Sequence, residues 1–295
     1  MNPGSVGVFD GSSFTSNSAH LGGAVGMYGG SLSCTTCHFE RNLGTGSGST
    51  GGAVRMQGGV GVFDGSSFTS NSAMLGGAVY IIAGSTIPSL NQTSFVNNTA
   101  SLKGGALYLN LSPQLTWDDA CPVLQTVAHG SQNHASQSGG FAFFDDVTLN
   151  PTECIMQLSI TVEDFGSAYY YGGGFATSPA RISVLSVQGS PYSSSKVVRV
   201  YPNQPISLVA SVHDAFRHPC LPSAVSLTTD PPSVEFIGSM QADMKNSSGK
   251  ASFTQASTVQ LLQGTADQRF NLSIGAHQVH SSLVLQMEVI DCPAG

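Results

Sequence analysis

Acidic residues are the side chains of this 295-residue chain whose spacing could support catalysis. The pairs Asp118-Asp119 and Asp145-Asp146 have the composition to hold a divalent cation or to act as acid and base. The alternative for both pairs is a solvated loop. Asp10 and Asp64 occupy identical places in two copies of a repeat, and because each precedes glycine we interpret them as turn residues. We therefore predict no catalytic residue, no metal site and no cofactor.

Cysteines are the second group that could carry chemistry. Cys34-Thr-Thr-Cys37 could be a redox pair or half of a zinc site. No second Cys-x-x-Cys follows, and the redox motif belongs in a βαβ setting, so we favour buried thiols or a local disulfide. We expect a disulfide between Cys121 and Cys154. Cys220 is expected to pair with Cys292, unless Cys292 pairs beyond this chain.

Charge and motif content exclude several functions. The 10 Lys plus Arg against 17 Asp plus Glu leave no basic footprint for nucleic acid. No apolar run approaches the roughly 20 residues of a membrane span. The eight histidines show no ligand spacing on a common face, and the chain has no Gly-x-Ser-x-Gly or phosphate-loop motif. We predict neither a nucleic-acid partner nor a membrane span.

A repeat must position these residues. GVFDGSSFTSNSA occurs at residues 7–19 and again, letter for letter, at 61–73, an offset of 54 residues that spans two units of about 27 residues each. Each unit contains Gly-Gly-Ala, which begins at residues 22, 51, 76 and 104. Each also contains Phe-x-x-Asn, formed by Phe14 and Asn17, Phe39 and Asn42, Phe68 and Asn71, and Phe95 and Asn98.

Apolar residues alternate with other types after each Gly-Gly-Ala, which indicates strands with one inner and one outer face. Units of this length, made of short strands and glycine-rich turns, favour a right-handed parallel β-helix with about 4.8 Å between coils. We expect the Phe residues to form an interior stack and the Asn residues a ladder of side-chain amides.

The outer positions predict a binding face. Arg55, Tyr80 and Tyr108 should stack on one flat surface beside Gln57 and Asn110. A row of aromatic and amide groups suits contact with sugars or proteins. The alternative is that tyrosine merely covers a β surface well.

The paired signatures resemble a known repeat type. Alternating FxxN and GGA[ILV] tetrapeptides over residues 5–112 are similar to the repeats of the polymorphic membrane protein family of bacterial autotransporter adhesins, a pattern also seen in large secreted algal multi-domain proteins. The resemblance implies an adhesive β-helix. After residue 112, nothing reads as the long series of strands of a membrane β-barrel.

Six cysteines and several N-x-S/T sequons predict an oxidising, extracellular or cell-surface setting. Met1 leads almost directly into the first repeat, so no signal peptide is recognised and we expect a fragment of a longer chain. The candidate glycosylation sites are Asn91, Asn97, Asn110, Asn246 and Asn271.

The expected fold is all-β, with two domains. Residues 1–178 are a parallel β-helix whose late coils, with diverged glycine sites at Gly139-Gly140-Phe141 and Gly173-Gly174-Phe175, end in a cap. Residues 179–291 carry short alternating strands between turn signals and predict an antiparallel Ig-like β-sandwich. Residues 292–295 resemble the start of a Cys-rich module.

The expected function is a non-catalytic structural or adhesive module that contacts glycans or cell-surface and extracellular-matrix proteins. The competing function is a polysaccharide lyase or glycoside hydrolase, since many β-helix proteins act on polysaccharides. Carboxylates gathered on adjacent coils around one groove would favour the enzyme.

Overall fold

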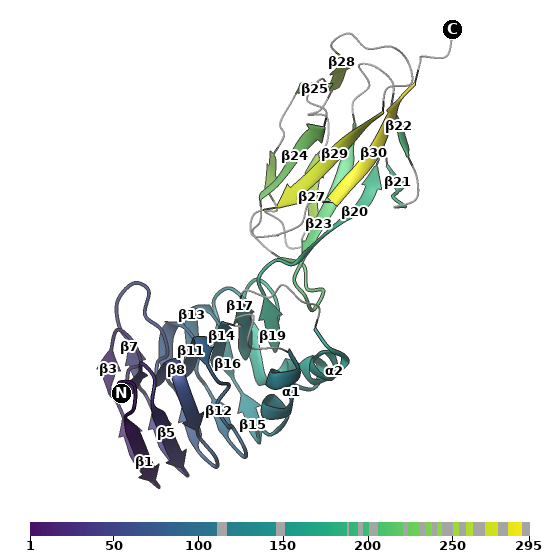
Figure 1. Cartoon of the computed structure of the whole chain (residues 1–295). Helices are drawn as coiled ribbons and strands as arrows, with labels where there is room; N and C mark the ends of the chain where they lie inside the picture. Colours follow the sequence, from purple (N-terminus) through teal and green to yellow (C-terminus); the bar gives the residue numbers. More distant parts are fainter. Residues whose placement is uncertain are drawn as a thin grey trace. The chain divides into compact units, whose positions relative to one another are not determined.

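The computed structural model divides into two compact units, Met1–Ser178 and Pro179–Gly295, drawn in Figure 1. This division falls at the residue where the sequence pattern changes. The structure describes residues 1–110, 117–145, 151–187, 189–193, 197–200, 206–220, 224–230, 234–237, 241–243, 250–253, 258–261, 269–276 and 283–290.

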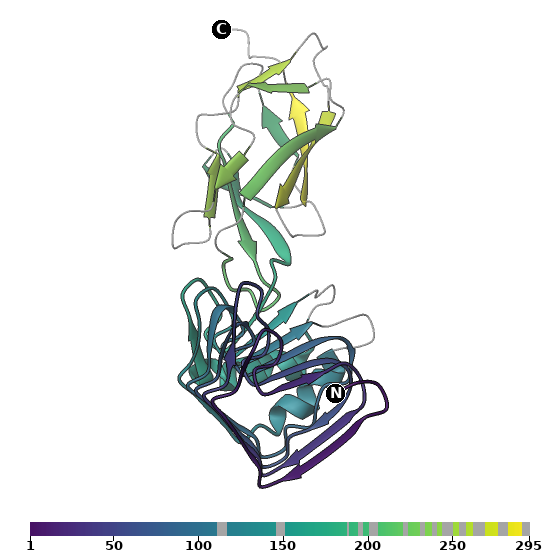
Figure 2. The ribbon, with the colours of Figure 1, turned by 90° about the vertical axis from the view of Figure 1, so that its left-hand side faces the viewer.

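Three parallel sheets build the first unit, and each coil of the chain adds a strand to them. The eight-stranded sheet contains β1 (Val6–Asp10), β4 (Val25–Met27), β5 (Ser31–Thr35), β8 (Val54–Val62), β11 (Val79–Ser85), β14 (Leu107–Asn110), β17 (Ala142–Asp145) and β19 (Phe175–Thr177). The five-stranded sheet contains β2 (Ser13–Thr15), β6 (His38–Glu40), β9 (Ser67–Thr69), β12 (Ser94–Val96) and β15 (His129–Ser131). The six-stranded sheet contains β3 (Ser18–Ala19), β7 (Leu43–Gly44), β10 (Ser72–Leu75), β13 (Thr99–Lys103), β16 (Asn133–Ala135) and β18 (Gly166–Ala168). Figure 2 shows the strands of successive coils lying over one another.

The Phe-x-x-Asn signature holds the coils in register. The rings of Phe14, Phe39, Phe68 and Phe95 stack in sequence, with centroids 4.7, 4.6 and 5.0 Å apart. The last three rings are fully buried, whereas Phe14 in the first coil is half-buried. Parallel stacking of identical rings at the strand spacing fills the interior of the coil without voids. The predicted interior stack is therefore present.

The asparagines form the predicted ladder. Asn71 Oδ1 accepts hydrogen bonds from the backbone N and the Nδ2 of Asn42, at 3.0 and 2.9 Å. Asn71 Nδ2 in turn donates to the carbonyl of Phe39 and to Asn98 Oδ1. The same contacts continue from Asn98 to Asn133 in the next coil. Every ladder amide thus bonds backbone groups that the turn would otherwise bury unpaired.

A glycine pair precedes each of β4, β8, β11 and β14, and its two positions favour glycine for different reasons. At the first position the backbone is left-handed, as at Gly76 with φ 62°, where glycine carries no Cβ penalty. At the second position, a Cβ on Gly77 would lie 2.1 Å from the carbonyl oxygen of Gly105 in the next coil. No other residue satisfies both requirements, so the motif recurs in every coil.

The late coils add one feature to the sequence analysis and correct it in one place. Phe95 pairs with Gly130, and the Phe165 ring occupies the space that a side chain at Gly130 would need. Asn133 still continues the ladder, so this coil keeps its asparagine after losing its phenylalanine. In the last coil the left-handed glycine is Gly172, and the predicted motif at 173–175 is therefore wrong by one residue.

The described chain is mostly β, as predicted, and two short α-helices interrupt it. α1 (Trp117–Gln125) and α2 (Glu153–Thr161) stand where earlier coils place a strand such as β1 or β5, and the 3-10 helix η1 (Glu163–Phe165) follows α2. The backbone N of Gln92 donates to the carbonyl of Thr126 just after α1, at 2.9 Å. In earlier coils a strand supplies such a partner. Here the residue that follows α1 supplies it, so the backbone at Gln92 does not remain unpaired.

The second unit is mostly antiparallel. One sheet contains β20 (Arg181–Val187), β21 (Ser190–Pro191), β23 (Leu208–His213) and β27 (Lys250–Phe253). Another contains β22 (Val198–Val200), β24 (Ala224–Asp230), β26 (Gln241–Asp243), β29 (Arg269–Ala276) and β30 (Leu283–Val289), and β25 (Val234–Ile237) pairs with β28 (Thr258–Leu261). Alternate residues of the longer strands, such as Leu272 and Ile274, are buried. Among the described strands of this unit, β22 and β30 form the one parallel pair.

Candidate ligand-contact surface

Three of the five predicted binding residues, Arg55, Tyr80 and Tyr108, lie in one outer row of the eight-stranded sheet. Register pairs Gly26 with Arg55, Arg55 with Tyr80, and Tyr80 with Tyr108. The row continues to Phe143 and Ala176 in the last two coils. The rings of Tyr80 and Tyr108 stack with centroids 4.9 Å apart, and those of Tyr108 and Phe143 with 5.4 Å.

The row is covered, however, and the expectation of an exposed face is wrong for its main members. Arg55 and Tyr80 are each 8% exposed and Tyr108 is 4% exposed. Leu75 and Tyr171 pack against these rings. Both residues directly precede a glycine pair, and the tight glycine turn brings them back over the outer row. Alternation distinguishes outside from inside, but it does not reveal this second layer.

The neighbouring row is more accessible. Gln57 is exposed, and Asn110 is half-buried beside Asp145, with which it pairs in register. Tyr108 donates a short hydrogen bond to Asp145, and the Ser178 hydroxyl donates to the same carboxylate at 2.7 Å. Burial first, and then the charge of Asp145, raise the pKa of Tyr108 far above its ordinary value. Asp145 is thus held by hydroxyl donors, which suits a structural carboxylate.

The N-terminal end of the outer row is the part that reaches the surface. The Tyr28 ring is 41% exposed and lies against the Arg55 guanidinium, whose Cζ is 5.1 Å from the ring centroid. Arg55 Nη2 donates to Gln57 Oε1 at 2.8 Å. Of the five predicted binding residues, Arg55 and Gln57 therefore meet at a surface, and Tyr28, which the sequence did not single out, completes it.

A second aromatic surface was also missed. Tyr169 is 78% exposed and Tyr170 36% exposed, and their rings meet edge to face with centroids 5.2 Å apart. The backbone N of Tyr170 donates to the carbonyl of Gln137 at 2.8 Å, which fixes the pair on the preceding coil. Three successive tyrosines before Gly172 are the sequence signal that could have located it.

The carboxylates do not assemble into a catalytic cluster in the described part of the chain. No group of three or more His, Cys, Asp or Glu residues there could hold a metal ion. Asp10 accepts a hydrogen bond from the Thr36 hydroxyl, and Asp64 accepts one from the Ser89 hydroxyl, each linking neighbouring coils. Asp146 and the side chain of Asp118 lie outside what the structure describes.

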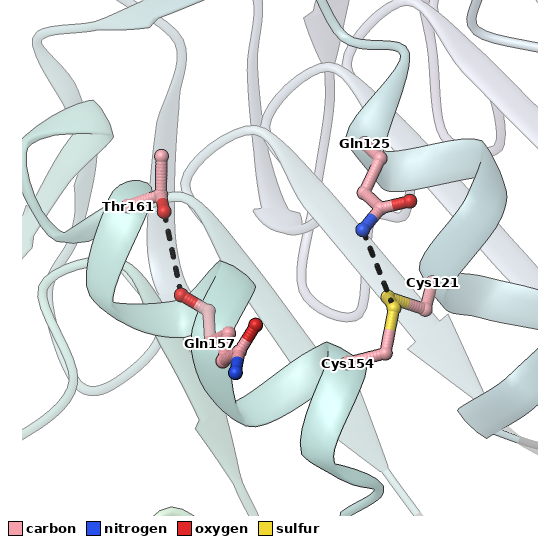
Figure 3. The surroundings of a disulfide bond; sticks show 5 residues. All are labelled: Cys121, Gln125, Cys154, Gln157 and Thr161. Carbon is pink, nitrogen blue, oxygen red and sulfur yellow. Dashed lines mark hydrogen bonds between the residues drawn. A yellow bond between two sulfur atoms is a disulfide. The ribbon is translucent and has the colours of Figure 1, made fainter.

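The cysteines follow the prediction where they are described. Cys121 on α1 and Cys154 on α2 form a disulfide with their Cα atoms 6.2 Å apart, and Gln125 Nε2 lies 3.4 Å from Cys154 Sγ (Figure 3). Cys34 and Cys37 are buried thiols, and burial is the main cause that raises the pKa of Cys34. Cys220 is buried with its Sγ 3.8 Å from the carbonyl of His218. Its expected partner Cys292 lies outside the described residues.

The sequons differ in accessibility. Asn91, Asn97 and Asn271 are exposed, and Asn110 is half-buried, so the first three present their amides to solvent. The Nδ2 of Asn97 also donates to the Ser70 hydroxyl at 3.1 Å. Asn246 lies outside the described residues.

No family model matches this chain. No curated protein matches it either. Among solved structures the chain is similar to domains 4 and 5 of the S-layer protein SbsC, at 16% sequence identity and a TM-score of 0.24. That match covers 39% of this chain and 55% of the other. A TM-score this low carries no argument about fold or function.

Membrane-spanning helices are absent from the described part of the chain, where neither helix is long and apolar enough to cross a bilayer.

Proposed function

We propose that the chain is a non-catalytic extracellular module that serves as a structural or adhesive contact with glycans or with cell-surface and extracellular-matrix proteins. The observation that carries this proposal is the exposed ring pair Tyr169 and Tyr170. Tyrosine rings supply rigid contact area at low entropic cost and stack on sugars and apolar side chains alike. A stack of coils is a suitable support, because each coil is held by its neighbours.

The proposed architecture is a right-handed parallel β-helix of the polymorphic membrane protein repeat type, followed by an Ig-like β-sandwich. Three parallel sheets, the phenylalanine stack and the asparagine ladder support the first assignment. Antiparallel pairing of β20 with β23 and of β29 with β30 supports the second.

The proposed setting is the cell surface or the extracellular space. A disulfide between Cys121 and Cys154 supports it, because such bonds persist in oxidising compartments. Exposed sequon asparagines at Asn91, Asn97 and Asn271 fit the same setting.

The test is binding of the purified chain to a glycan array and to cell surfaces. Tyr169→Ala with Tyr170→Ala should lower the signal by about tenfold or more, since exposed aromatic anchors carry much of the free energy of such contacts. Tyr169→Phe with Tyr170→Phe keeps both rings and should retain most of the binding. Tyr80→Phe with Tyr108→Phe alters buried rings and serves as the control for indirect effects on folding.

Unchanged binding by the double alanine variant would refute this role for the pair. Release of products from polysaccharides by the purified chain, with loss of that activity in Asp145→Asn, would replace the adhesive proposal with the glycoside-cleaving alternative.

A further inference from the structure

A buried positive charge without a carboxylate partner lies at the exposed end of the outer row. Arg55 is 92% buried, and its Nε and Nη1 have no hydrogen-bond partner among the described residues. Among the described residues Arg41 pairs with Glu40, and Arg199 and Arg269 pair with Glu288, whereas Arg55 has no carboxylate within ion-pair distance. Arginine keeps its charge at every accessible pH, so it cannot escape this environment by losing a proton.

The surroundings of Arg55 add a second unpaired group. Thr50 Oγ1 is also buried without a hydrogen-bond partner, and Thr50 precedes the glycine pair of the same coil. Leu75 has the same place in the next coil, where it packs against the outer row that contains Tyr80. On the other side of Arg55 the row contains Gly26, and a Cβ there would meet the Leu21 carbonyl at 3.2 Å and the Tyr28 ring at 3.9 Å.

We infer that Arg55, with Thr50 and Tyr28, forms a binding site for a small oxyanion. Leaving charged donors buried and unpaired is costly, whereas carboxylate or sulfate oxygens would accept from them in strong charge-assisted hydrogen bonds. The aromatic face of Tyr28 supplies part of the stabilisation that an anion would otherwise give. Thr50, which pairs in register with Leu75, would contribute a hydroxyl donor from the corresponding place in this coil.

The ligand that these groups favour is an acidic sugar, an assignment that rests on the proposed function. Tyr28 is the exposed aromatic ring beside the site, and the Gln57 amide is exposed next to it. A ring and an amide flanking a cation suit the hydroxyl-rich body and the acidic group of one residue. Both unpaired nitrogens are buried, so side chains around the guanidinium must shift to admit the acidic group.

The site is tested on the whole chain by NMR of the arginine Nε–H signals. Glucuronate and glucose 6-sulfate are the probes, glucose is the neutral control, and sodium chloride keeps the ionic strength constant. Saturable movement of the Arg55 Nε–H signal with either acidic sugar, and none with glucose, is the expected result. Absence of such movement would overturn the inference. An N-acetylated glutamate dipeptide that binds more tightly than glucuronate would overturn the assignment to a sugar.

Matched variants distinguish the site from general charge effects. Arg55→Gln should weaken glucuronate binding by about tenfold or more, measured by calorimetry, while Arg41→Gln at an exposed, paired arginine should leave it unchanged. Arg55→Lys keeps the charge but loses Nε and the planar fork, and should also bind more weakly. Tyr28→Ala removes the ring that flanks the guanidinium and should also weaken glucuronate binding.

Equal affinity in Arg55→Gln, or unchanged affinity in Tyr28→Ala, would contradict the site. Because these experiments do not involve Tyr169 or Tyr170, their failure is separable from failure of the proposed function.

Discussion

Replacement of one ladder asparagine tests the stacking of the coils most directly. Asn71 makes four side-chain hydrogen bonds: its Oδ1 accepts from Asn42 N and Asn42 Nδ2, and its Nδ2 donates to the Phe39 carbonyl and to Asn98 Oδ1. All four lie between 2.9 and 3.0 Å, and Asn71 is buried. At about 1 kcal/mol net for each bond, Asn71→Ala should lower the free energy of unfolding by about 3 to 5 kcal/mol.

The chain contains a matched control for this variant. Asn17 stands in the same local sequence, but it is exposed, and its side chain makes one hydrogen bond, from Nδ2 to Asn42 Oδ1 at 3.0 Å. Asn17→Ala should therefore cost about 1 kcal/mol or less, since solvent can replace that bond. The difference between the two variants removes the effect of the substitution on local backbone preference.

Urea unfolding followed by Trp117 fluorescence is the assay. Trp117 is the single tryptophan, and it is buried on α1 against Phe144, so it reports on the first unit alone. The slopes of the free energy against urea must agree between variants for the comparison to hold. A difference below about 1 kcal/mol between Asn71→Ala and Asn17→Ala would refute the reasoning, because the four buried bonds would then contribute little.

Three further predictions concern the same unit. Phe68→Ala should cost about 3 to 5 kcal/mol in the same assay, and Phe14→Ala clearly less, because Phe68 is fully buried between two rings and Phe14 is half-buried. Loss of the Cys121–Cys154 disulfide, by reduction or by Cys121→Ser with Cys154→Ser, should lower stability by about 2 to 4 kcal/mol in melting curves; an unchanged midpoint would contradict this. Burial and the charge of Asp145 raise the folded-state pKa of Tyr108, whereas the unfolded chain releases this proton near pH 10. Stability should therefore be fully present below about pH 10 and fall above it, and Tyr108→Phe should flatten that decline in melts between about pH 9 and 11.

Periodicity in the sequence was sufficient to predict the inner part of the first unit. Phe68 and Asn71 recur in a fixed register, and stacked coils reward identical residues at identical places, so their partners could be named. The Cys121–Cys154 pair was also predicted, and the structure places the two cysteines on α1 and α2 in successive coils. Strands of the second unit such as β20 and β25 follow from alternation between turn residues.

What lies outside the repeat signature could not be predicted in the same way. Gly130 replaces a phenylalanine, and the ring that fills its place, Phe165, comes from a later segment with no signature of its own. Three consecutive glycines precede Phe175, and only the hydrogen-bond register with the previous coil shows that Gly172 takes the left-handed place. The helices α1 and α2 replace strands without changing the repeat on either side.

The candidate site was predicted in part for a related reason. Alternation correctly placed Arg55, Tyr80 and Tyr108 on the outside of the coil. Leu75 and Tyr171 fold back at the glycine turns and pack against the row that contains Tyr80 and Tyr108, and the residue type at their place varies from apolar to polar between coils. An outer layer built by such irregular residues has no period to detect.

The identical segments 7–19 and 61–73 allow the stack to change length without a new junction. Removal of residues 7–60 would join Val6 to Gly61 and restore the same letters, Val-Gly-Val-Phe-Asp, at the terminal strand. The shortened chain would carry Phe63, Phe68 and Asn71 in place of Phe9, Phe14 and Asn17, so the coil that follows Val6 would keep the same side chains. Gain or loss of 54 residues by recombination between the copies thus changes the length of the stack in steps of two coils, while the residues at the junction stay the same.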